Sequence, residues 1–409
     1  MSDAVKSILM LGGSRQQVVA IEKAKQLGFR TVLCDYLPDN PGQYVADVFY
    51  QESTTDRERM LEIARAEGVS GVLAYASDPA AATAAYVAEA LRLPTNPLAA
   101  VETLSEKHLF RAFLKSAGLP CPGAVPFRVD EAVEEVAAKV GGLRFPVVVK
   151  PTDSSGSKGV TVLRGLDELA GAIAHAKEFS RNGTLICEEY IEKEFPHVVG
   201  GDIFVVDGQI RFWGLMSCLR DESLGGLVPV GEFMPSGLPE QALRNVKDVL
   251  QRLVSALDIH FGELNVEVIV GEAGVPYMLE LGARAGGNMI PVQLSDASGI
   301  DLVAANVLCA MGEDPGDISW DSANVEGGWA TYVLHSGSEG VFQGVEVADE
   351  LRVCVYREVP YAAPGDIVAR FDGANRALGI EFLKFENAAQ MDTLLSRSPE
   401  LVRLVVGEC

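Results

Sequence analysis

The sequence of 409 residues has no apolar run that approaches the twenty or so residues needed to cross a bilayer. Its first apolar stretch, Ile8–Leu11, is too short for the core of a secretory signal and runs directly into two glycines. The seven cysteines are scattered singly, with no CxxC pair and no cluster of cysteine with histidine. This spacing argues against a disulfide framework and a zinc site, so we expect a cytoplasmic protein without a membrane partner.

Positive charge is also scarce, with 34 lysines and arginines against 57 acidic residues and a net charge of −23. So acidic a chain repels nucleic acid, which we therefore exclude as a partner. Any site for a phosphate must instead be built locally, from a few lysines, backbone N–H groups and metal ions. The basic residues that stand in glycine-rich contexts accordingly carry more weight than their number suggests.

The first hundred residues alternate apolar strands with amphipathic helices. The expected strands are Ser7–Leu11, Thr31–Cys34 and Gly71–Tyr75, and the expected helices are Gln17–Leu27, Arg57–Glu67 and Ala80–Leu91. This alternation is typical of parallel βαβ units, whose carboxyl-end loops form a crevice. The loop Gly12-Gly13-Ser14 lies at such an end but lacks a full GxGxxG, so a ligand contact and a simple tight turn are equally open.

The rest of the chain has a different pattern. Pro94–Pro97 is typical of a linker, and Ser105–Ala117 is predicted as one helix with Ser105 as its N-cap. From Phe145 onward, longer strands and glycine-rich turns indicate an α+β region, which continues to a final helix at Ala388–Arg397. We therefore predict an α/β and α+β protein in three parts, at residues 1–100, 101–315 and 316–409.

The first strong motif runs from Phe145 to Val162, where an apolar strand delivers Lys150 to a loop of small residues and a second strand follows. Small residues let backbone N–H groups approach a phosphate closely. A plain hairpin is the alternative, but its turn needs only two to five residues. The loop is not a Walker loop either, because GxxxxGK[ST] does not match. The pattern favours a phosphate-binding flap made of Ser154, Ser155, Gly156, Ser157, Lys158 and Gly159.

The second motif is a pair of strands, Leu264–Val270 and Val275–Leu281, joined by Gly-Glu-Ala-Gly. If Ala273-Gly274 forms a two-residue turn, Glu267 lies directly opposite Glu280, with Cβ atoms about 5 Å apart. Met278 then shares their face of the sheet. Two like charges repel each other, and a bound Mg²⁺ or Mn²⁺ removes the conflict. Solvated carboxylates on an exposed face are the alternative, but the apolar neighbours favour an interior sheet and hence a metal site.

The third motif, Gly282–Pro291, places Arg284 four residues after Glu280 in a glycine-rich turn. Its planar guanidinium could hold a phosphate or a carboxylate with two hydrogen bonds. Gly287 and Asn288 lie in the same turn and could contact and orient a substrate. Glycine doublets also occur for purely steric reasons, so the substrate role of this turn is an interpretation.

Taken together, these motifs resemble the ATP-grasp superfamily over nearly the whole chain. The resemblance implies an ATP-grasp fold, with a Rossmann-like pre-ATP-grasp domain at 1–100 and a C-terminal segment completing the substrate side. It also implies that Lys107 and Lys150 contact ATP, and that Met278 packs against the adenine. The hinge strand that pairs with adenine is expected at Glu188, Glu189, Tyr190 and Ile191. For the ribose, both Glu194 and His197 remain open.

The chain departs from the family at one informative place. Many members have E-[IV]-N-x-R as the second metal element, whereas this chain has Glu280-Leu-Gly-Ala-Arg284 and lacks the asparagine. The departure resembles amino-acid ligases and other carboxylate–amine ligases. The resemblance thus implies an ADP-forming ligase that converts a carboxylate into an acyl phosphate and passes it to an amine, with catalytic roles for Lys150 and Arg284.

The same resemblance implies small-molecule carboxylate and amine substrates, with Arg220 suited to an acidic or amino-acid substrate, and a homodimer. Three alternatives stay open. The first is a carboxylase resembling biotin carboxylase, although a biotin-accepting Met-Lys-Met is absent. The second is a Rossmann oxidoreductase, which would leave the Glu267–Glu280 pair unexplained. The third is an ATP-binding protein that has lost turnover.

Overall fold

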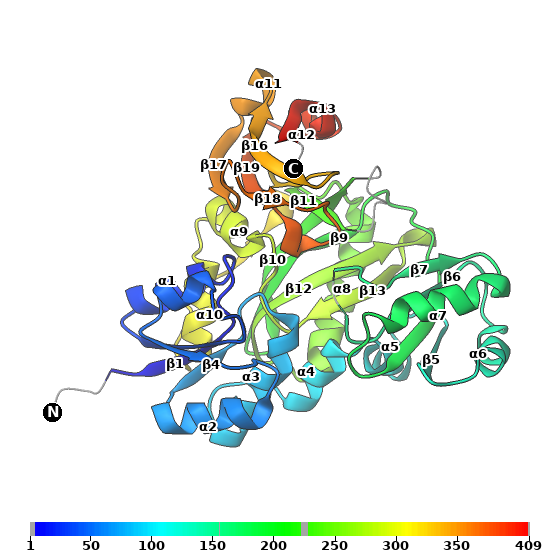
Figure 1. Cartoon of the computed structure of the whole chain (residues 1–409), viewed down its shortest axis with the longest axis horizontal. Coiled ribbons are helices and arrows are strands. Elements are labelled where there is room, and N and C mark those ends of the chain that lie inside the picture. Colours follow the sequence, from blue (N-terminus) through cyan, green and yellow to red (C-terminus); the bar gives the residue numbers. More distant parts are fainter. Residues whose placement is uncertain (1–4, 155, 222–227, 408–409) are drawn as a thin grey trace.

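The computed structural model describes residues 5–154, 156–221 and 228–407, which form an N-terminal, a central and a C-terminal region around one large sheet (Figure 1). Ser155, one of the predicted flap residues, lies outside the described residues. Within the part of the chain that is described, no helix is both long and apolar enough to pass through a membrane.

The N-terminal region is a parallel sheet, as the alternation of strands and helices predicted. Its strand order is β3-β2-β1-β4. The strands are β1 (Ser7–Leu11), β2 (Arg30–Asp35), β3 (Val48–Gln51) and β4 (Gly71–Leu73), and the helices are α1 (Val18–Gln26), α2 (Arg57–Glu67) and α3 (Asp78–Leu91). Asp78 is the first residue of α3 and so projects from the carboxyl end of β4, where the predicted crevice opens.

A small antiparallel sheet, β5-β8-β6-β7, forms the lobe that carries the flap. It consists of β5 (Ala124–Arg128), β6 (Val147–Pro151), β7 (Thr161–Leu163) and β8 (Thr184–Glu189), with α5 (Lys107–Ser116), α6 (Val133–Val140) and α7 (Leu169–Lys177). The predicted helix Ser105–Ala117 is wrong at its start. Ser105 instead ends α4 (Leu98–Ser105), where its hydroxyl donates to the Val101 carbonyl. Glu106, in an extended conformation, separates the two helices.

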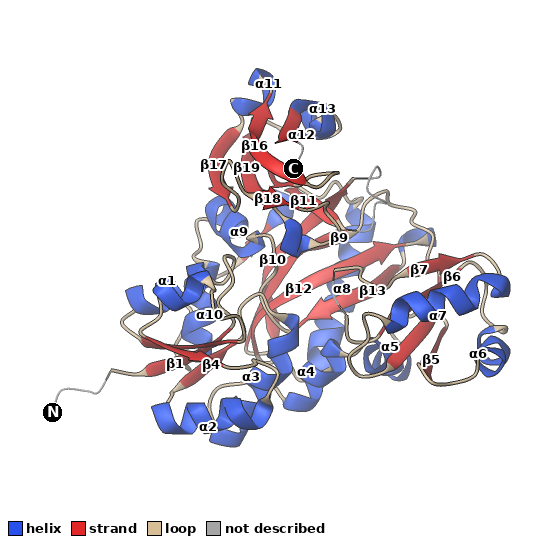
Figure 2. Cartoon of the chain, viewed as in Figure 1, coloured by secondary structure: helices blue, strands red, loops and turns tan. Residues whose placement is uncertain are grey.

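The large sheet has nine strands in the order β13-β12-β9-β10-β11-β15-β19-β17, with the short β14 paired to β10 (Figure 2). Its strands are β9 (Val199–Val206), β10 (Gln209–Arg220), β11 (Pro229–Met234), β12 (Phe261–Val270), β13 (Pro276–Gly282), β14 (Trp320–Asp321), β15 (Gly328–Leu334), β17 (Val355–Pro360) and β19 (Gly379–Phe385). The C-terminal residues therefore extend the central sheet with β15, β19 and β17. They add a three-stranded sheet of β16 (Gly340–Val347), β18 (Ile367–Val368) and β20 (Val402–Gly407), with α11 (Asp349–Arg352), α12 (Ala388–Leu395) and α13 (Ser398–Leu401).

The two faces of the large sheet are covered differently, because side chains alternate along each strand. We call the face that carries Glu267 and Glu280 the front face. On the opposite, back face, α8 (Glu240–Ala256) packs its apolar stripe onto Val266, Val268 and neighbouring residues of β9 and β10. Farther along the back face, α12 covers β15 and β19. On the front face, α9 (Ile290–Ser298) and α10 (Leu302–Ala310) pack against aromatic residues of β9 and β10 and leave the β12–β13 end open.

Candidate active site

A cavity of about 220 Å³ lies between the flap lobe and the open end of the front face. Residues from α5, β6, the flap, the hinge strand β8 and the β12–β13 hairpin line it together, although they come from distant parts of the sequence. Of the predicted site residues, it is lined by Lys107, Lys150, Ser154, Gly156, Ser157, Lys158, Glu188, Glu189, Tyr190, Ile191, Arg220, Glu267 and Glu280.

Three cations converge on this cavity. Lys150, at the end of β6, is almost fully buried and donates to the Glu188 carboxylate across 2.7 Å. Arg111 is equally buried, with its Nε 2.9 Å from the same carboxylate. Lys107 reaches in from the first turn of α5 and donates to the Ser154 carbonyl across 2.7 Å. Because a phosphate is an anion with several acceptor oxygens, this excess of donors over acceptors fits a polyphosphate.

The pKa values of Glu188 and Lys150 are set by burial and by their charged neighbours. Burial alone would raise the pKa of Glu188, but the charges of Arg111 and Lys150 hold that pKa at about 2. Burial lowers the pKa of Lys150, and the Glu188 carboxylate offsets only part of that shift. In the Lys150–Glu188 pair, the charged form of the lysine is therefore destabilised by burial. An anionic ligand next to Lys150 would stabilise the charged form.

Arg111 is a site residue that sequence reasoning missed. It lies one helical turn after Lys107 on α5, so both side chains leave the helix on the same side. Besides Glu188, it donates to the Leu279 carbonyl on β13 across 2.9 Å. The i, i+4 spacing from a lysine already predicted to contact ATP was the available signal. Arg111 thereby joins α5, the hinge strand and the strand that carries Glu280.

The predicted register of the hairpin is confirmed at its centre, where Glu267 pairs with Glu280. The route to it differs from the prediction. The turn is longer than two residues, so Val270 pairs with Pro276 and Val268 pairs with Met278. A β-bulge at Leu279 then restores the register between Val268 and Glu267. The two carboxylates therefore face each other because two departures from the ideal hairpin compensate.

The same bulge overturns the prediction for Met278. An extra residue between Met278 and Glu280 reverses the alternation, so that Met278 points to the back face. Its side chain is completely buried in the core beneath α8. Leu279 and Ile269 line the cavity in its place and supply the apolar surface that a flat ring would need.

The opposed carboxylates lie in an environment that favours a cation. Burial and the negative charge of Glu280 raise the pKa of Glu267. Lys107 lies 3.2 Å from Glu280 and relieves part of the repulsion. Among the residues that the structure describes, no group of three or more histidines, cysteines or acids is placed to hold a metal by itself. The pair therefore fits a divalent ion whose remaining ligands come from phosphate oxygens and water.

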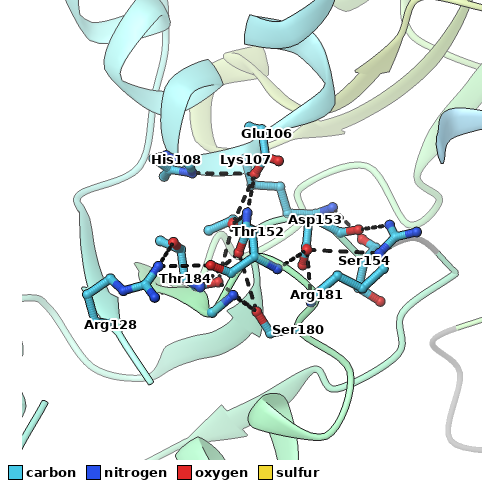
Figure 3. A network of polar contacts seen from close by, with 12 residues as sticks. Glu106, Lys107, His108, Arg128, Thr152, Asp153, Ser154, Ser180, Arg181 and Thr184 are labelled. Atoms are coloured by element: carbon cyan, nitrogen blue, oxygen red, sulfur yellow. Dashed lines mark hydrogen bonds and ion pairs between the residues drawn. The ribbon is translucent and has the colours of Figure 1, made fainter. Parts of the chain in front are cut away.

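The base of the flap is fixed by a network of polar contacts (Figure 3). The Asp153 carboxylate accepts hydrogen bonds from the backbone N–H groups of Arg181 and Asn182, across 2.9 and 2.7 Å. The Thr152 hydroxyl donates to the Glu106 carboxylate across 3.1 Å, and the Thr152 carbonyl accepts a hydrogen bond from the backbone N–H of Lys107. Beyond this anchor, Gly156, Ser157 and Gly159 adopt positive φ values, which turn the chain back on itself. Of these three, Gly159 packs beside Pro151 and Phe179, outside the cavity lining.

Arg284 does not line this cavity, and its contact with a ligand stays a prediction. Its guanidinium forms a bidentate ion pair with Asp78, at 2.6 Å from Nε to Oδ1 and 2.7 Å from Nη2 to Oδ2. Burial raises the pKa of Asp78, but the charge of Arg284 outweighs burial and lowers it. The guanidinium of Arg284 is therefore paired with the N-terminal region, and the pair lies beside Gly282 at the end of the strand that carries Glu280.

The remaining predicted residues also lie away from the cavity. Glu194 accepts a hydrogen bond from the Gly274 backbone across 3.2 Å, and the His197 ring packs edge-on against Phe233. Asn288 has a positive φ, and its backbone N–H donates to the Gln16 side chain near Gly287. Neither ribose candidate is brought to the cavity. Lys193, which lies just before them in the same loop, lines it instead.

Sequence reasoning also missed a pair of buried acids on the front face. The Asp202 carboxylate accepts from the Asn265 side chain and the Gly286 backbone, across 2.8 and 2.9 Å. Burial and the neighbouring Asp202 raise the pKa of Glu263 well above its ordinary value. Asp202 is completely buried and Glu263 almost completely. Period-two alternation along β9 and β12 does not indicate that these two carboxyl groups meet.

Comparison with known proteins agrees with this geometry. The family model described as "Carbamoyl-phosphate synthase L chain, ATP binding domain" matches residues 106–316, which include the flap lobe and the carboxylate hairpin. Among curated proteins, the chain is 28% identical over 242 residues to the uncharacterized protein y4rH of Sinorhizobium fredii, covering 57% of this chain and 47% of that one. It is 28% identical over 270 residues to a formate-dependent phosphoribosylglycinamide formyltransferase of Burkholderia mallei, covering 63% and 64%. The chain thus spans less than two thirds of either relative.

Among solved structures, the L-amino acid ligase of Bacillus licheniformis superposes with a TM-score of 0.81. The match covers the whole of both chains at 19% sequence identity. At that identity, the likeness establishes the shared fold. It extends beyond the family model to the N-terminal parallel sheet and the C-terminal segment.

Proposed function

Because the chain belongs to the family of the carbamoyl-phosphate synthase L chain ATP-binding domain, within the ATP-grasp superfamily, we propose that it is an ADP-forming carboxylate–amine ligase. One observation carries the proposal: Glu267 and Glu280 face each other directly in a cavity that also collects Lys107, Lys150 and Arg111. This is a site for ATP with a divalent cation, Mg²⁺ or Mn²⁺.

The roles follow from charge and position. Glu267 and Glu280 would hold the divalent cation, which supplies neutralisation of the phosphate oxygens when bound. Lys107, Lys150 and Arg111 place fixed positive charge where negative charge moves during phosphate transfer to a carboxylate. The flap closes over them from its anchored base and keeps water from the activated acid. The apolar surface of Ile269 and Leu279 holds the adenine in the place predicted for Met278.

Two kinds of evidence support a carboxylate and an amine as the substrates. The formyltransferase relative is named for its dependence on formate, and the similar structure is named as an L-amino acid ligase. In this sequence, Gly282 stands where many family members have a metal-binding asparagine, as in carboxylate–amine ligases. We further propose the division at residues 1–100, 101–315 and 316–409, and a homodimer.

The proposal is tested by measuring ADP release against a matrix of carboxylates and amines. We expect sustained ADP release only when an acid and an amine are both present, and hydroxylamine in place of the amine to trap the activated acid as a hydroxamate. Glu280→Gln is expected to abolish both signals. Glu272→Gln, an exposed carboxylate in the turn of the same hairpin, is the matched control and should retain them.

The alternatives predict different results in the same assay. Turnover stimulated by bicarbonate and biotin alone would contradict a carboxylate–amine ligase and identify a carboxylase. Nucleotide binding without turnover for any acid and amine would identify a catalytically silent ATP-binding protein. The Rossmann oxidoreductase gains no support, because Gln17 fills the space over Gly12 and the N–H of Gly13 donates to Asp35.

A further inference from the structure

The large sheet carries a second and larger cavity, of about 580 Å³, at its back face. Its floor is formed by Leu219, Phe233 and Tyr332, from β10, β11 and β15. One wall is formed by α12 and α13, and the opposite wall by the loop that precedes β9 together with Ser236 and Gly237. The volume lies within the range of small-molecule sites, about 300–1,000 Å³.

Strand register places this cavity on the opposite side of the sheet from the carboxylate pair. Val268 alternates with Glu267 along β12, so it faces the back. Val268 pairs with Val199, which pairs with Ser217. Ser217 in turn pairs with Phe233, so Phe233 shares the face of Val268. On this face, α8 and the pair α12 and α13 cover different parts of the sheet. Residues of α12 and α13 line the cavity, as do Ser236 and Gly237, which precede α8.

The lining of the cavity is suited to a flat apolar group. The Phe233 ring meets the His197 ring edge-on, with centroids 5.1 Å apart, and the Phe195 ring lies 5.7 Å from His197. Burial lowers the pKa of His197, which favours the neutral ring and hence an aromatic surface. Tyr332 adds a fourth ring, and burial raises its pKa to about 12. Aromatic walls of this kind bind another ring by edge and face contacts.

The rim of the cavity carries charges of both signs. Lys193 lies in the loop between β8 and β9, and Arg220 is the last residue of β10. Asp392, on an exposed turn of α12, and Asp221 line other parts of the rim. Asp221 already accepts from the buried His335 across 3.1 Å, which leaves Asp392 as the better placed acid for a ligand cation. A ligand that pairs with the cations Lys193 and Arg220 and also with the carboxylate of Asp392 must carry both charges, as a zwitterion does.

We propose that this back-face cavity is a second ligand site, distinct from the catalytic cleft, for a small zwitterion with an apolar ring, such as an aromatic α-amino acid. The apolar group would lie on Phe233 and Tyr332, the carboxylate toward Lys193 and Arg220, and the ammonium toward Asp392. Lys193 and Arg220, with Val198, also line the catalytic cleft, so the two sites adjoin around the end of the sheet. The proposal does not depend on the ligase reaction, because it concerns binding alone.

The test is calorimetric titration of the full chain, without nucleotide, with L-phenylalanine, phenylacetate and 2-phenylethylamine. The proposal expects L-phenylalanine to bind at least about tenfold more tightly than either singly charged analogue. Ser396→Trp fills the cavity from the C-terminal end of α12, where the backbone is helical and the side chain exposed. Thr393→Trp is the matched control, since Thr393 is exposed on the same helix but does not line the cavity.

Ser396→Trp and Asp392→Asn should each weaken L-phenylalanine binding at least tenfold, whereas Thr393→Trp should leave it unchanged. Glu267→Gln, which alters the catalytic cleft, should also leave it unchanged. Failure of L-phenylalanine to bind would overturn the proposal, as would binding that survives both cavity variants or is lost in Glu267→Gln. Circular dichroism of each variant confirms that it is folded. Because no turnover is measured, a failed ligase assay would not affect the result.

Discussion

The opposed carboxylates predict an unusual response to mutation: Glu267→Gln should stabilise the ligand-free protein while removing its ability to be stabilised by ligand. Two unit charges about 5 Å apart repel by about 3 kcal/mol at an effective dielectric constant of 20. Lys107, which lies 3.2 Å from Glu280, and the charge of Arg220 offset part of that repulsion. The expected gain in the free energy of unfolding is therefore on the order of 1 kcal/mol.

The sign of the pH dependence follows from the raised pKa of Glu267, which is caused by burial and then by Glu280. A carboxyl group whose pKa is higher in the folded state favours folding when protonated and opposes it when ionised. The penalty is complete above the folded pKa and absent below the unfolded value of about 4.3. Replacement by glutamine should thus stabilise the protein near pH 8, and the gain should vanish as the pH falls toward about 4.

The stability of the ligand-free Glu267→Gln variant is measured by urea unfolding in EDTA, followed by circular dichroism. Glu272→Gln serves as the control from the same hairpin. Repeating the unfolding with Mg²⁺ and ADP measures the stabilisation by ligand, because a ligand that binds only the folded state stabilises it by RT ln(1 + [L]/Kd). The wild type and Glu272→Gln should gain stability, and Glu267→Gln should gain little. A Glu267→Gln variant that is less stable near pH 8 and still responds fully to ligand would refute the reasoning.

Two further variants test the connections between regions of the fold. Asp78→Ala removes one side of the bidentate ion pair with Arg284, so a largely buried arginine loses its partner. The free energy of unfolding, measured by urea denaturation, should fall by about 2–4 kcal/mol. A fall of less than about 0.5 kcal/mol would show that the pair contributes no net stability. Arg111→Met keeps the aliphatic volume but removes the donors to Glu188 and Leu279, so ADP affinity, measured by calorimetry, should fall at least tenfold. Lys115→Met, in the last turn of α5, should leave ADP affinity unchanged.

How far the sequence predicted this protein is clearest at the hairpin. Period-two counting placed Glu267 opposite Glu280, and the structure confirms that pair. The count nevertheless assumed a shorter turn and no bulge, so it placed Met278 on the wrong face. Register counting is reliable for a pair only when turn length and bulges are known, and neither leaves a clear trace in local composition.

Contacts between distant segments could not be predicted from the sequence. Arg284 was expected to hold a phosphate or a carboxylate because it lies in a glycine-rich turn four residues after Glu280. Its partner is Asp78, 206 residues earlier, at the start of α3. The missed pair of Asp202 and Glu263 has the same cause, because it is assembled by neighbouring strands of the large sheet.

The sequence by itself determined the features that depend on short-range geometry. These are the alternation that gives the N-terminal parallel sheet, the strand that ends at Lys150 with its small-residue flap, and the facing carboxylates. Each depends on strand periodicity or on the steric freedom of small residues, which act over a few positions. Only the tertiary structure decided which charges meet: Arg111 with Glu188, Arg284 with Asp78, and the rim of the back-face cavity. Burial makes an unpaired charge costly, so such residues acquire partners through packing, and sequence order does not show which partners those are.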